Sequence, residues 1–215
     1  MKKFRALAAI LAAGMGLAGE ASATLLVRPG GMVYDTDLNI TWLQDANLGA
    51  GSSYDNGIST TDGLMTWQNA VNWAANLSYG GYDDWRLPTA LNQDGSGPCL
   101  GYNCTGSELG HLFYSELGAT LGNSILSGTP AELAKFSNIQ SYVYWSGTEY
   151  APNTNVAWGF NTNFGYQDGG GKSSEFFAWA VRPGDVAAAV PEPASLTLLA
   201  AGLVGWLGTR RKAAA

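Results

Sequence analysis

The chain has few basic residues and one histidine, and both scarcities limit what it can do. Its 11 Lys and Arg residues are outnumbered by 17 Asp and Glu residues. Between residues 24 and 190, five basic residues stand against fifteen acidic ones, a net charge of −10. Such a surface repels phosphate backbones, so we expect no nucleic-acid partner. A Ser-His-Asp or Cys-His site would have to use His111, which we expect to be half exposed on a helix, and we predict no catalytic residue.

Cysteine is equally scarce, with Cys99 and Cys104 as the only two. Because no second pair exists, a zinc knuckle is excluded. The two lie five positions apart in a polar, turn-rich loop. In an oxidising compartment, cysteines this close form a local disulfide, which we predict here.

A long apolar run is missing as well. The run at residues 194–208 has fifteen residues and would reach only ~22 Å as a helix, whereas a bilayer span needs about 20 residues. Pro191, Glu192 and Pro193 precede it, and the basic residues 210–212 follow it and should stay in the cytoplasm. An ordinary tail anchor is one interpretation of this segment.

The same order of spacer, short apolar helix and basic stop resembles the PEP-CTERM sorting signal of Gram-negative bacteria that make exopolysaccharide. The resemblance implies that residues 190–215 are a sorting signal with a short transmembrane helix. It also implies an exosortase partner, cleavage near Pro191, Glu192 and Pro193, and a transient membrane tether.

The N-terminus indicates export too. Lys2, Lys3 and Arg5 are basic, and residues 6–18 are apolar. Ala21 and Ala23 form an A-x-A cleavage site, so residues 1–23 are predicted to be a signal peptide. One domain remains, residues 24–189. We expect an inner-membrane intermediate and then a location on the cell surface or in the extracellular matrix.

Hydrophobic patterns predict an α+β domain, with helices early and a sheet late. Two strands, 33–35 and 40–43, are joined by a turn at 36–39. A helix capped by Thr66 should end at Gly80-Gly81, and a second helix should be capped by Ser107. Their predicted inward residues are Trp67, Ala70, Val71, Ala74 and Leu77 on the first helix and Leu109, Leu112, Phe113 and Leu117 on the second.

The second half is predicted to hold a short helix at 131–135 and strands at 142–146, 155–164 and 176–182. In the middle strand, Trp158, Phe160 and Phe164 should share one face. The glycine-rich segment 165–174 between the last two strands is predicted to be a flexible hairpin loop.

Six blocks occur in order, at residues 33–42, 66–77, 80–89, 144–149, 157–161 and 178–183. Together they resemble the Lcl C-terminal domain family. The resemblance implies a C-type-lectin-like fold, with two helices packed on a small twisted antiparallel sheet and with long loops. Where a role is known in this family, it is adhesion to acidic glycans at the cell surface. In this chain the Cys99–Cys104 loop interrupts the usual run from Pro88-Thr89 into the next helix.

The block Asp83-Asp84-Trp85-Arg86-Leu87-Pro88 also has a direct physical interpretation. Arg86 is flanked by carboxylates with which a guanidinium can pair. Pro88 forces Leu87 into an extended conformation, so Trp85 and Leu87 should both point into the core. We therefore interpret Asp84 to Pro88 as a structural corner rather than a ligand site, and Arg182 in the same way.

Oxygen-bearing side chains occur at alternate positions in Asp35, Asp37 and Asn39. This spacing is typical of calcium loops, but the glycine and the distal glutamate of an EF-hand are missing. The alternative is an Asx-rich turn whose side chains bind their own backbone. Apart from this calcium ion, no cofactor is predicted.

Abundant aromatic and glycine residues (8 Trp, 10 Tyr, 29 Gly) are typical of glycan-binding domains as well as of aromatic cores. The predicted ligand contacts are loop residues, namely Tyr150, Asn153, Tyr166, Gln167 and Asp168. The negative charge argues against direct pairing with acidic sugars. The leading hypothesis is a non-catalytic domain that binds exopolysaccharide or a surface glycan. A matrix polysaccharide hydrolase that uses two of the carboxylates, and a self-associating structural protein, remain the alternatives.

Overall fold

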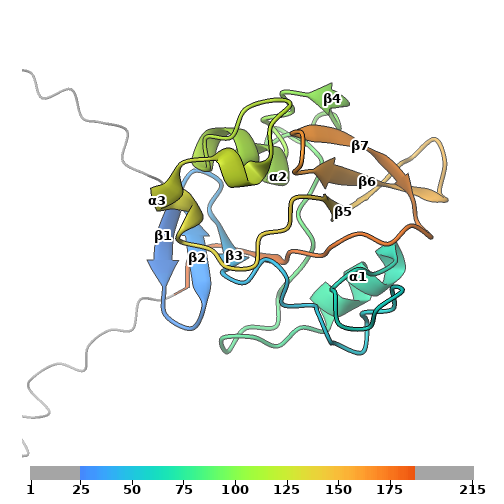
Figure 1. The fold of residues 1–215 in the computed structure, drawn as a ribbon, viewed down its shortest axis with the longest axis horizontal. Helices are drawn as coiled ribbons and strands as arrows, with labels where there is room; N and C mark the ends of the chain where they lie inside the picture. The colour runs from blue at the N-terminus through green and yellow to red at the C-terminus, as the bar shows by residue number, and fades with distance from the viewer. Residues whose placement is uncertain (1–24, 187–215) are drawn as a thin grey trace, which may run out of the picture.

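Two four-stranded antiparallel sheets and a shared aromatic core make up the domain (Figure 1). The computed structural model describes residues 25–186. The first sheet, called here the terminal sheet, has the order β1-β2-β3-β8, and the second, the distal sheet, has the order β4-β7-β6-β5. The strands are β1 (Leu25–Arg28), β2 (Met32–Asp35), β3 (Ile40–Leu43), β4 (Gly101–Tyr102), β5 (Val143–Glu149), β6 (Val156–Asn161), β7 (Tyr166–Gly171) and β8 (Val181–Pro183).

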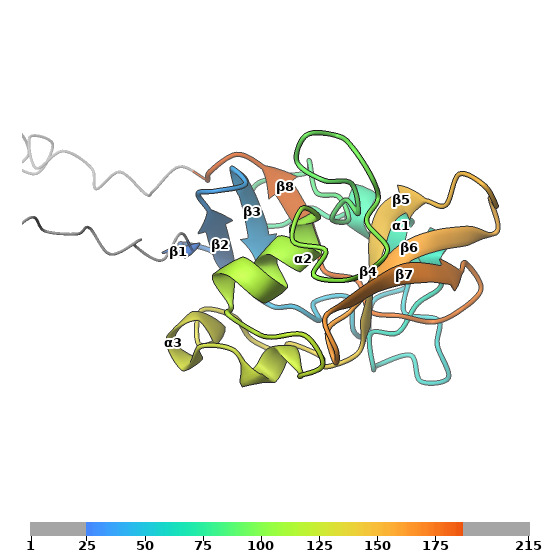
Figure 2. The same cartoon turned by 90° about the horizontal axis from the view of Figure 1, so that it is seen from above.

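Short helices fill the space around the sheets. Figure 2 shows α2 lying between the terminal and distal sheets, while α1 packs near β5. The predicted α+β class is therefore confirmed, but two sheets stand where one was expected. The helical segments are α1 (Trp67–Ala75), α2 (Glu108–His111), a π-helical turn (Leu112–Glu116), a 3-10 turn (Ile125–Ser127) and α3 (Pro130–Leu133).

The terminal sheet contains the two strands that were predicted around the turn, β2 and β3. Their turn is held by Asp35, whose Oδ1 accepts hydrogen bonds from the backbone N–H groups of Asp37 and Leu38 at 3.1 and 3.0 Å. Asn39 closes the turn in the left-handed conformation, which Asn tolerates. The sequence did not indicate β1, which pairs with β2 along its full length.

The prediction of a flexible loop at 165–174 is wrong, because most of it forms β7. Tyr166 pairs with Asn161 and Gly171 pairs with Val156, so the whole strand lies in register with β6. Three consecutive glycines are weak strand formers, which hid the strand. The ring of Phe176 covers the middle glycine, because a Cβ added at Gly170 would lie 2.7 Å from it.

Two neighbouring strands are shorter than predicted. Strand β6 ends at Asn161, so Phe164 lies in the following turn and is 44% exposed instead of sharing a face with Phe160. Only the end of the predicted strand 176–182 belongs to a sheet. Before β8, Phe176 pairs with Met65 and Phe177 with Tyr144, because this segment passes from the distal to the terminal sheet.

Buried tryptophans join the two sheets into one core. Trp179 has no exposed surface and packs against Trp42 at 5.3 Å and Tyr144 at 5.5 Å between ring centroids. Its indole N–H donates to the Leu43 carbonyl at 2.8 Å, so its burial leaves no polar group unpaired. A single side chain therefore contacts elements of both sheets.

Helix α1 starts directly after Thr66, as predicted, but no side-chain hydrogen bond from Thr66 caps it. It ends at Ala75, earlier than predicted, and Gly80 and Gly81 instead form a positive-φ turn between Tyr79 and Tyr82. The inward face of α1 includes Trp73, which the prediction omitted, while Val71 and Leu77 are partly buried.

Helix α2 is capped by Ser107, whose Oγ accepts from the Gly110 N–H at 3.2 Å, as predicted. The four apolar residues predicted to point inward are buried. His111 is only 8% exposed, so the prediction of a half-exposed histidine is wrong. Helix α3 lies within one residue of the predicted start at 131.

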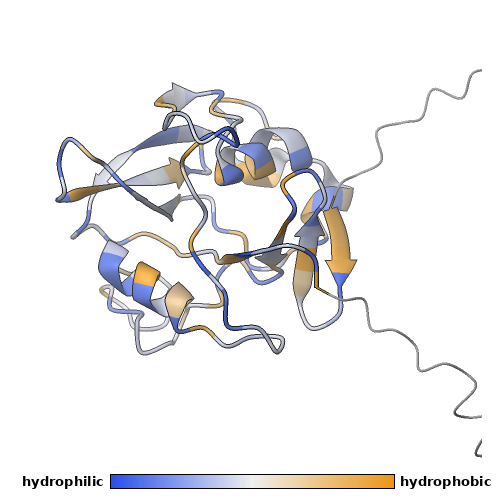
Figure 3. Cartoon of the chain, turned by 180° about the vertical axis from the view of Figure 1, so that it is seen from behind, coloured by the Kyte–Doolittle hydropathy of each residue, from blue (hydrophilic) through white to orange (hydrophobic). Residues whose placement is uncertain are grey.

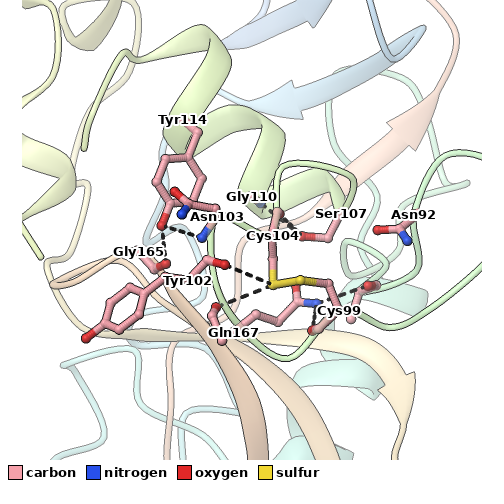
Figure 4. The surroundings of a disulfide bond; sticks show 12 residues. Asn92, Cys99, Tyr102, Asn103, Cys104, Ser107, Gly110, Tyr114, Gly165 and Gln167 are labelled. Carbon is pink, nitrogen blue, oxygen red and sulfur yellow. Dashed lines mark hydrogen bonds between the residues drawn. A yellow bond between two sulfur atoms is a disulfide. The ribbon is translucent and has the colours of Figure 1, made fainter. Parts of the chain in front are cut away.

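The predicted disulfide between Cys99 and Cys104 is present and lies beside the distal sheet (Figure 4). Gln167 of β7 reaches the same loop, donating to the carbonyls of Ala90 at 3.2 Å and Cys99 at 2.7 Å. The loop that interrupts the family pattern is thus fixed both by its own disulfide and by a buried side chain of β7.

Both ends of the described chain lie at the terminal sheet, away from β5, β6 and β7 (Figure 1). Arg28 and Asp185 join them through two hydrogen bonds of 2.8 and 2.7 Å. Figure 3 shows β1 as a largely hydrophobic strand, and its Leu26 and Val27 are 38% and 53% exposed. Within residues 25–186, no helix has the length and apolar character to cross a membrane. The predicted signal peptide and the predicted C-terminal transmembrane helix lie outside these residues.

Candidate functional site

The outer face of the distal sheet carries a hollow of about 210 Å³. Side chains point to alternate faces along a strand, so Tyr166 and Asp168 share this outer face with Asn161, which pairs with Tyr166. Three glycines keep the floor free of side chains, and Phe176 closes one wall. The lining residues are Val143, Gly159, Asn161, Tyr166, Asp168, Gly169, Gly170 and Phe176.

Exposed tyrosines flank this hollow. Tyr102 packs edge-on against Tyr166 at 4.7 Å between ring centroids, and Tyr142 packs against Phe176 at 6.1 Å. Tyr102 and Tyr142 are 46% and 47% exposed. The hollow and its two flanking tyrosines, here called the aromatic groove, therefore combine ring surfaces with the amide of Asn161 and the carboxylate of Asp168.

Two of the five predicted ligand contacts, Tyr166 and Asp168, meet in the aromatic groove. Gln167 does not, because its side chain points inward, is 1% exposed and holds the disulfide loop, so its role is structural. Tyr150 packs on Trp158, and Asn153 accepts a hydrogen bond from the Asn155 N–H. Both lie in the β5–β6 connection and neither lines the hollow.

Asn161 and Phe176 are groove residues that the sequence prediction missed. The two-residue spacing of Tyr166 and Asp168 would have placed both on one face, had the glycine-rich segment been assigned as a strand. Phe176 gave no such signal, because its position depends on the crossing between the two sheets.

Two larger hollows lie beside Thr89. One, of about 340 Å³, includes Trp67 and Trp85, whose rings are 7% and 3% exposed and so offer little stacking surface. The other, of about 450 Å³, is lined by polar loop residues around Asn92 and Gln93 and contains no aromatic ring. The aromatic groove is therefore the better candidate for a ligand with a flat apolar face.

The charged residues of the predicted structural corner form ion pairs with partners other than those predicted. Arg86 pairs with Glu108 through two contacts of 2.7 Å rather than with its sequence neighbours, and the hydrogen bond to Glu108 raises the pKa of Arg86. Asp84 pairs instead with Arg182 at 2.7 and 3.0 Å. Trp85 and Leu87 are buried, as the effect of Pro88 on the preceding residue predicts.

The predicted calcium residues form a turn in this structure. Asp35 is fully buried and binds the turn backbone, Asp37 is exposed, and Asn39 accepts from the Tyr34 hydroxyl at 2.8 Å. These contacts agree with the Asx-turn interpretation.

The one histidine of the chain lies in a buried acidic setting. Burial raises the pKa of Asp35, and the charge of Glu116 raises it further, while the Leu38 N–H, His111 and Trp42 oppose that rise. For His111, burial disfavours the charged ring, but the hydrogen bond to Glu116 and the charges of Asp35, Glu116 and Asp37 outweigh it, so its pKa is raised.

Comparison with known proteins gives two matches. The family model described as the Lcl C-terminal domain matches residues 31–182. The PEP-CTERM protein-sorting motif matches residues 189–212. No curated protein matches the chain.

Proposed function

This chain belongs to the Lcl C-terminal domain family and ends in a PEP-CTERM sorting motif, and from that premise we propose that it binds an extracellular polysaccharide without altering it chemically. The sorting motif supports export through the membrane to a bacterial cell surface and recognition by an exosortase. The predicted cleavage sites at Ala21 and Ala23 and at Pro191, Glu192 and Pro193 lie outside the described residues. We also propose that the source is a Gram-negative bacterium, that the protein lies in the biofilm matrix and that its fold is C-type-lectin-like.

The aromatic groove is the observation that supports polysaccharide binding. Tyr166 and Phe176 offer ring surfaces on which the C–H faces of a sugar can stack, and Asn161 and Asp168 offer hydrogen bonds to its hydroxyls. Its volume lies below the roughly 300 Å³ of pockets that enclose small ligands. An open, shallow groove suits one or two rings of a polymer that continues past it at both ends.

Charge narrows the class of polymer. Asp168 is exposed in the groove, and the region between residues 24 and 190 has a net charge of −10. An acidic polysaccharide would be repelled unless a cation bridged it. We therefore propose a neutral, hydroxyl-rich polysaccharide as the preferred ligand.

The placement of reactive side chains supports a role without catalysis. Both cysteines are joined in a disulfide, and the histidine is buried against Asp35 and Glu116, outside the aromatic groove.

The test is retention of the full chain on the exopolysaccharide of the producing bacterium, by affinity electrophoresis with and without calcium. We expect Tyr166→Ala to weaken retention about 10-fold, as loss of a central aromatic contact does, and Asp168→Asn to weaken it less. Asn153→Ala, in the β5–β6 connection, is the matched control and should bind normally.

Two results would contradict the proposal. One is no retention at any calcium level, and the other is an equal loss in the Asn153→Ala control. Release of shortened glycans that a single Asp or Glu substitution abolishes would establish the hydrolase instead.

Self-association is a second candidate, favoured by β1. This edge strand exposes Leu26 and Val27, and unpaired apolar edges are templates for pairing with another copy. Light scattering tests it, with Val27→Lys as the variant expected to shift an oligomer to a monomer. A monomeric unmodified chain would exclude it.

A further inference from the structure

We propose that Asp35, His111 and Glu116 form a binding site for a divalent transition metal ion of the Zn²⁺ type, which ties the terminal sheet to the helix that lies between the sheets. Asp35 comes from the end of β2, His111 from the end of α2, and Glu116 from the π-helical turn that follows. The proposal is independent of polysaccharide binding, since none of the three residues lines the aromatic groove.

The three potential ligand atoms already lie close together. His111 Nε2 is 3.0 Å from Glu116 Oε1 and 4.0 Å from Asp35 Oδ2, and one ligand atom from each residue lies within 4.8 Å of the others. Bonds of about 2.0–2.1 Å in a tetrahedral zinc site place neighbouring ligand atoms about 3.3 Å apart. Binding would therefore require the more distant ligand atoms to approach each other by roughly 1 Å.

One ligand atom lacks any other partner. Asp35 is fully buried, and its Oδ1 accepts the two turn N–H groups, but its Oδ2 makes no hydrogen bond and points toward His111. The indole N–H of Trp42 favours the charged form of Asp35, but it makes no hydrogen bond of normal geometry to this oxygen. A buried carboxylate oxygen without a partner is costly, and a cation between the three side chains would supply one.

The π-helical turn explains how residues five apart come to face each other. In a regular α-helix, His111 and Glu116 would be about 140° apart around the axis. The widened turn, in which the Leu117 N–H donates to the Leu112 carbonyl, shifts Glu116 round to face His111. Such π-bulges often occur at functional sites.

The donor set selects the ion. One imidazole nitrogen and two carboxylate oxygens suit Zn²⁺ and similar transition ions, whereas Ca²⁺ takes six to eight oxygen ligands. The side chains of Asp35, His111 and Glu116 are 0%, 10% and 5% exposed. Burial this deep would shield the ion from solvent, so the ion would hold the three elements together rather than meet a substrate.

The experiment uses the full chain in mild detergent, stripped with EDTA and titrated calorimetrically with Zn²⁺, Mn²⁺ or Ca²⁺ alone. We expect one equivalent of Zn²⁺ to bind with a Kd of about 1 µM or lower and to raise the Tm, and Ca²⁺ to do neither. Asp35→Asn, which keeps an oxygen for the turn N–H groups, and His111→Gln should each weaken Zn²⁺ binding about 100-fold. Asp37→Asn, an exposed carboxylate of the same turn, is the matched control and should bind normally.

Three outcomes would overturn the proposal: no saturable Zn²⁺ or Mn²⁺ binding, an equal loss in Asp37→Asn, or undiminished binding in folded Asp35→Asn and His111→Gln. If those variants do not fold, Co²⁺ added to the unmodified chain decides the matter. An intense tetrahedral visible spectrum that one equivalent of Zn²⁺ removes supports the site, and the weak spectrum of hydrated Co²⁺ contradicts it.

Discussion

The terminal and distal sheets are built by different means. The terminal sheet holds both ends of the described chain, and the Arg28–Asp185 and Asp84–Arg182 pairs lie at its margin. The distal sheet depends on a glycine-rich strand, a covering phenylalanine and a disulfide loop held by Gln167. The terminal sheet thus holds the two ends of the domain together. The distal sheet has a surface with few side chains, on which a ligand can lie.

The largest expected effect comes from breaking the core that the two sheets share. Trp179→Ala should cost about 3–5 kcal/mol, because it removes a fully buried ring that packs on Trp42 and Tyr144. Urea unfolding followed by circular dichroism measures the loss. Phe164→Ala, at an exposed position, should change stability by less than about 0.5 kcal/mol. A loss confined to one sheet would show that the core is not shared.

Opening the disulfide should weaken the distal sheet selectively. Cys99→Ser with Cys104→Ser is expected to cost about 2 kcal/mol, the low end for a short closed loop. Amide hydrogen exchange should rise in β4 and β7, next to this loop, and stay unchanged in β2 and β3. Equal exchange in both sheets would contradict the assignment of this loop to the distal sheet.

A side chain added to the groove floor should lower both the stability of the fold and the binding of polysaccharide. Gly170→Ala places a methyl group 2.7 Å from Phe176, which should cost about 1–2 kcal/mol and weaken polysaccharide retention. Gly171→Ala is the matched control, because its nearest neighbour is Ser174 Oγ at 3.8 Å. Urea unfolding and affinity electrophoresis measure the two effects. Normal retention by Gly170→Ala would place the ligand elsewhere.

The smallest expected effect is a pH dependence confined to the terminal sheet. Hydrogen bonds from Arg182 and Arg28 lower the pKa values of Asp84 and Asp185. Each carboxylate therefore stabilises the fold above its unfolded pKa, and this contribution is lost as pH falls through the lowered pKa of the folded state. Because both side chains are partly exposed, each pair should contribute less than about 1 kcal/mol.

Urea unfolding between about pH 6 and pH 2 tests this expectation against the Asp84→Asn variant. The variant should show a shallower loss of stability in acid than the unmodified chain. An identical slope would mean that the Asp84–Arg182 pair contributes nothing.

How much the sequence predicted also differs between the sheets. Strands β2 and β3 followed from short runs of strand-forming residues on either side of a turn. The burial of Trp85 and Leu87 followed from the effect of Pro88. Both are local rules. Strand β7 did not follow from such a rule, because its three glycines carry no hydrophobic pattern and only Gly170 is covered by Phe176.

The sequence also failed to predict which side chains contact each other. The pairing of Arg86 with Glu108 and the approach of Asp35 to His111 join residues far apart in the sequence, and no local rule could have indicated them. The family resemblance and the sorting motif predicted the class of protein well. Several motifs in a fixed order identify a family even when individual side-chain contacts cannot be predicted.

The backbone around Val181 has a mechanical consequence. Its N–H and C=O each bond to the backbone of Arg86 at 2.8 Å, while β3 holds the strand on its other side. If the protein is tethered through its C-terminus while a bound polymer exerts a force on the aromatic groove, that force is transmitted to the tether through β8. A strand that is hydrogen-bonded on both sides is hard to detach, so the structural corner would stabilise the C-terminal end of the domain against this force.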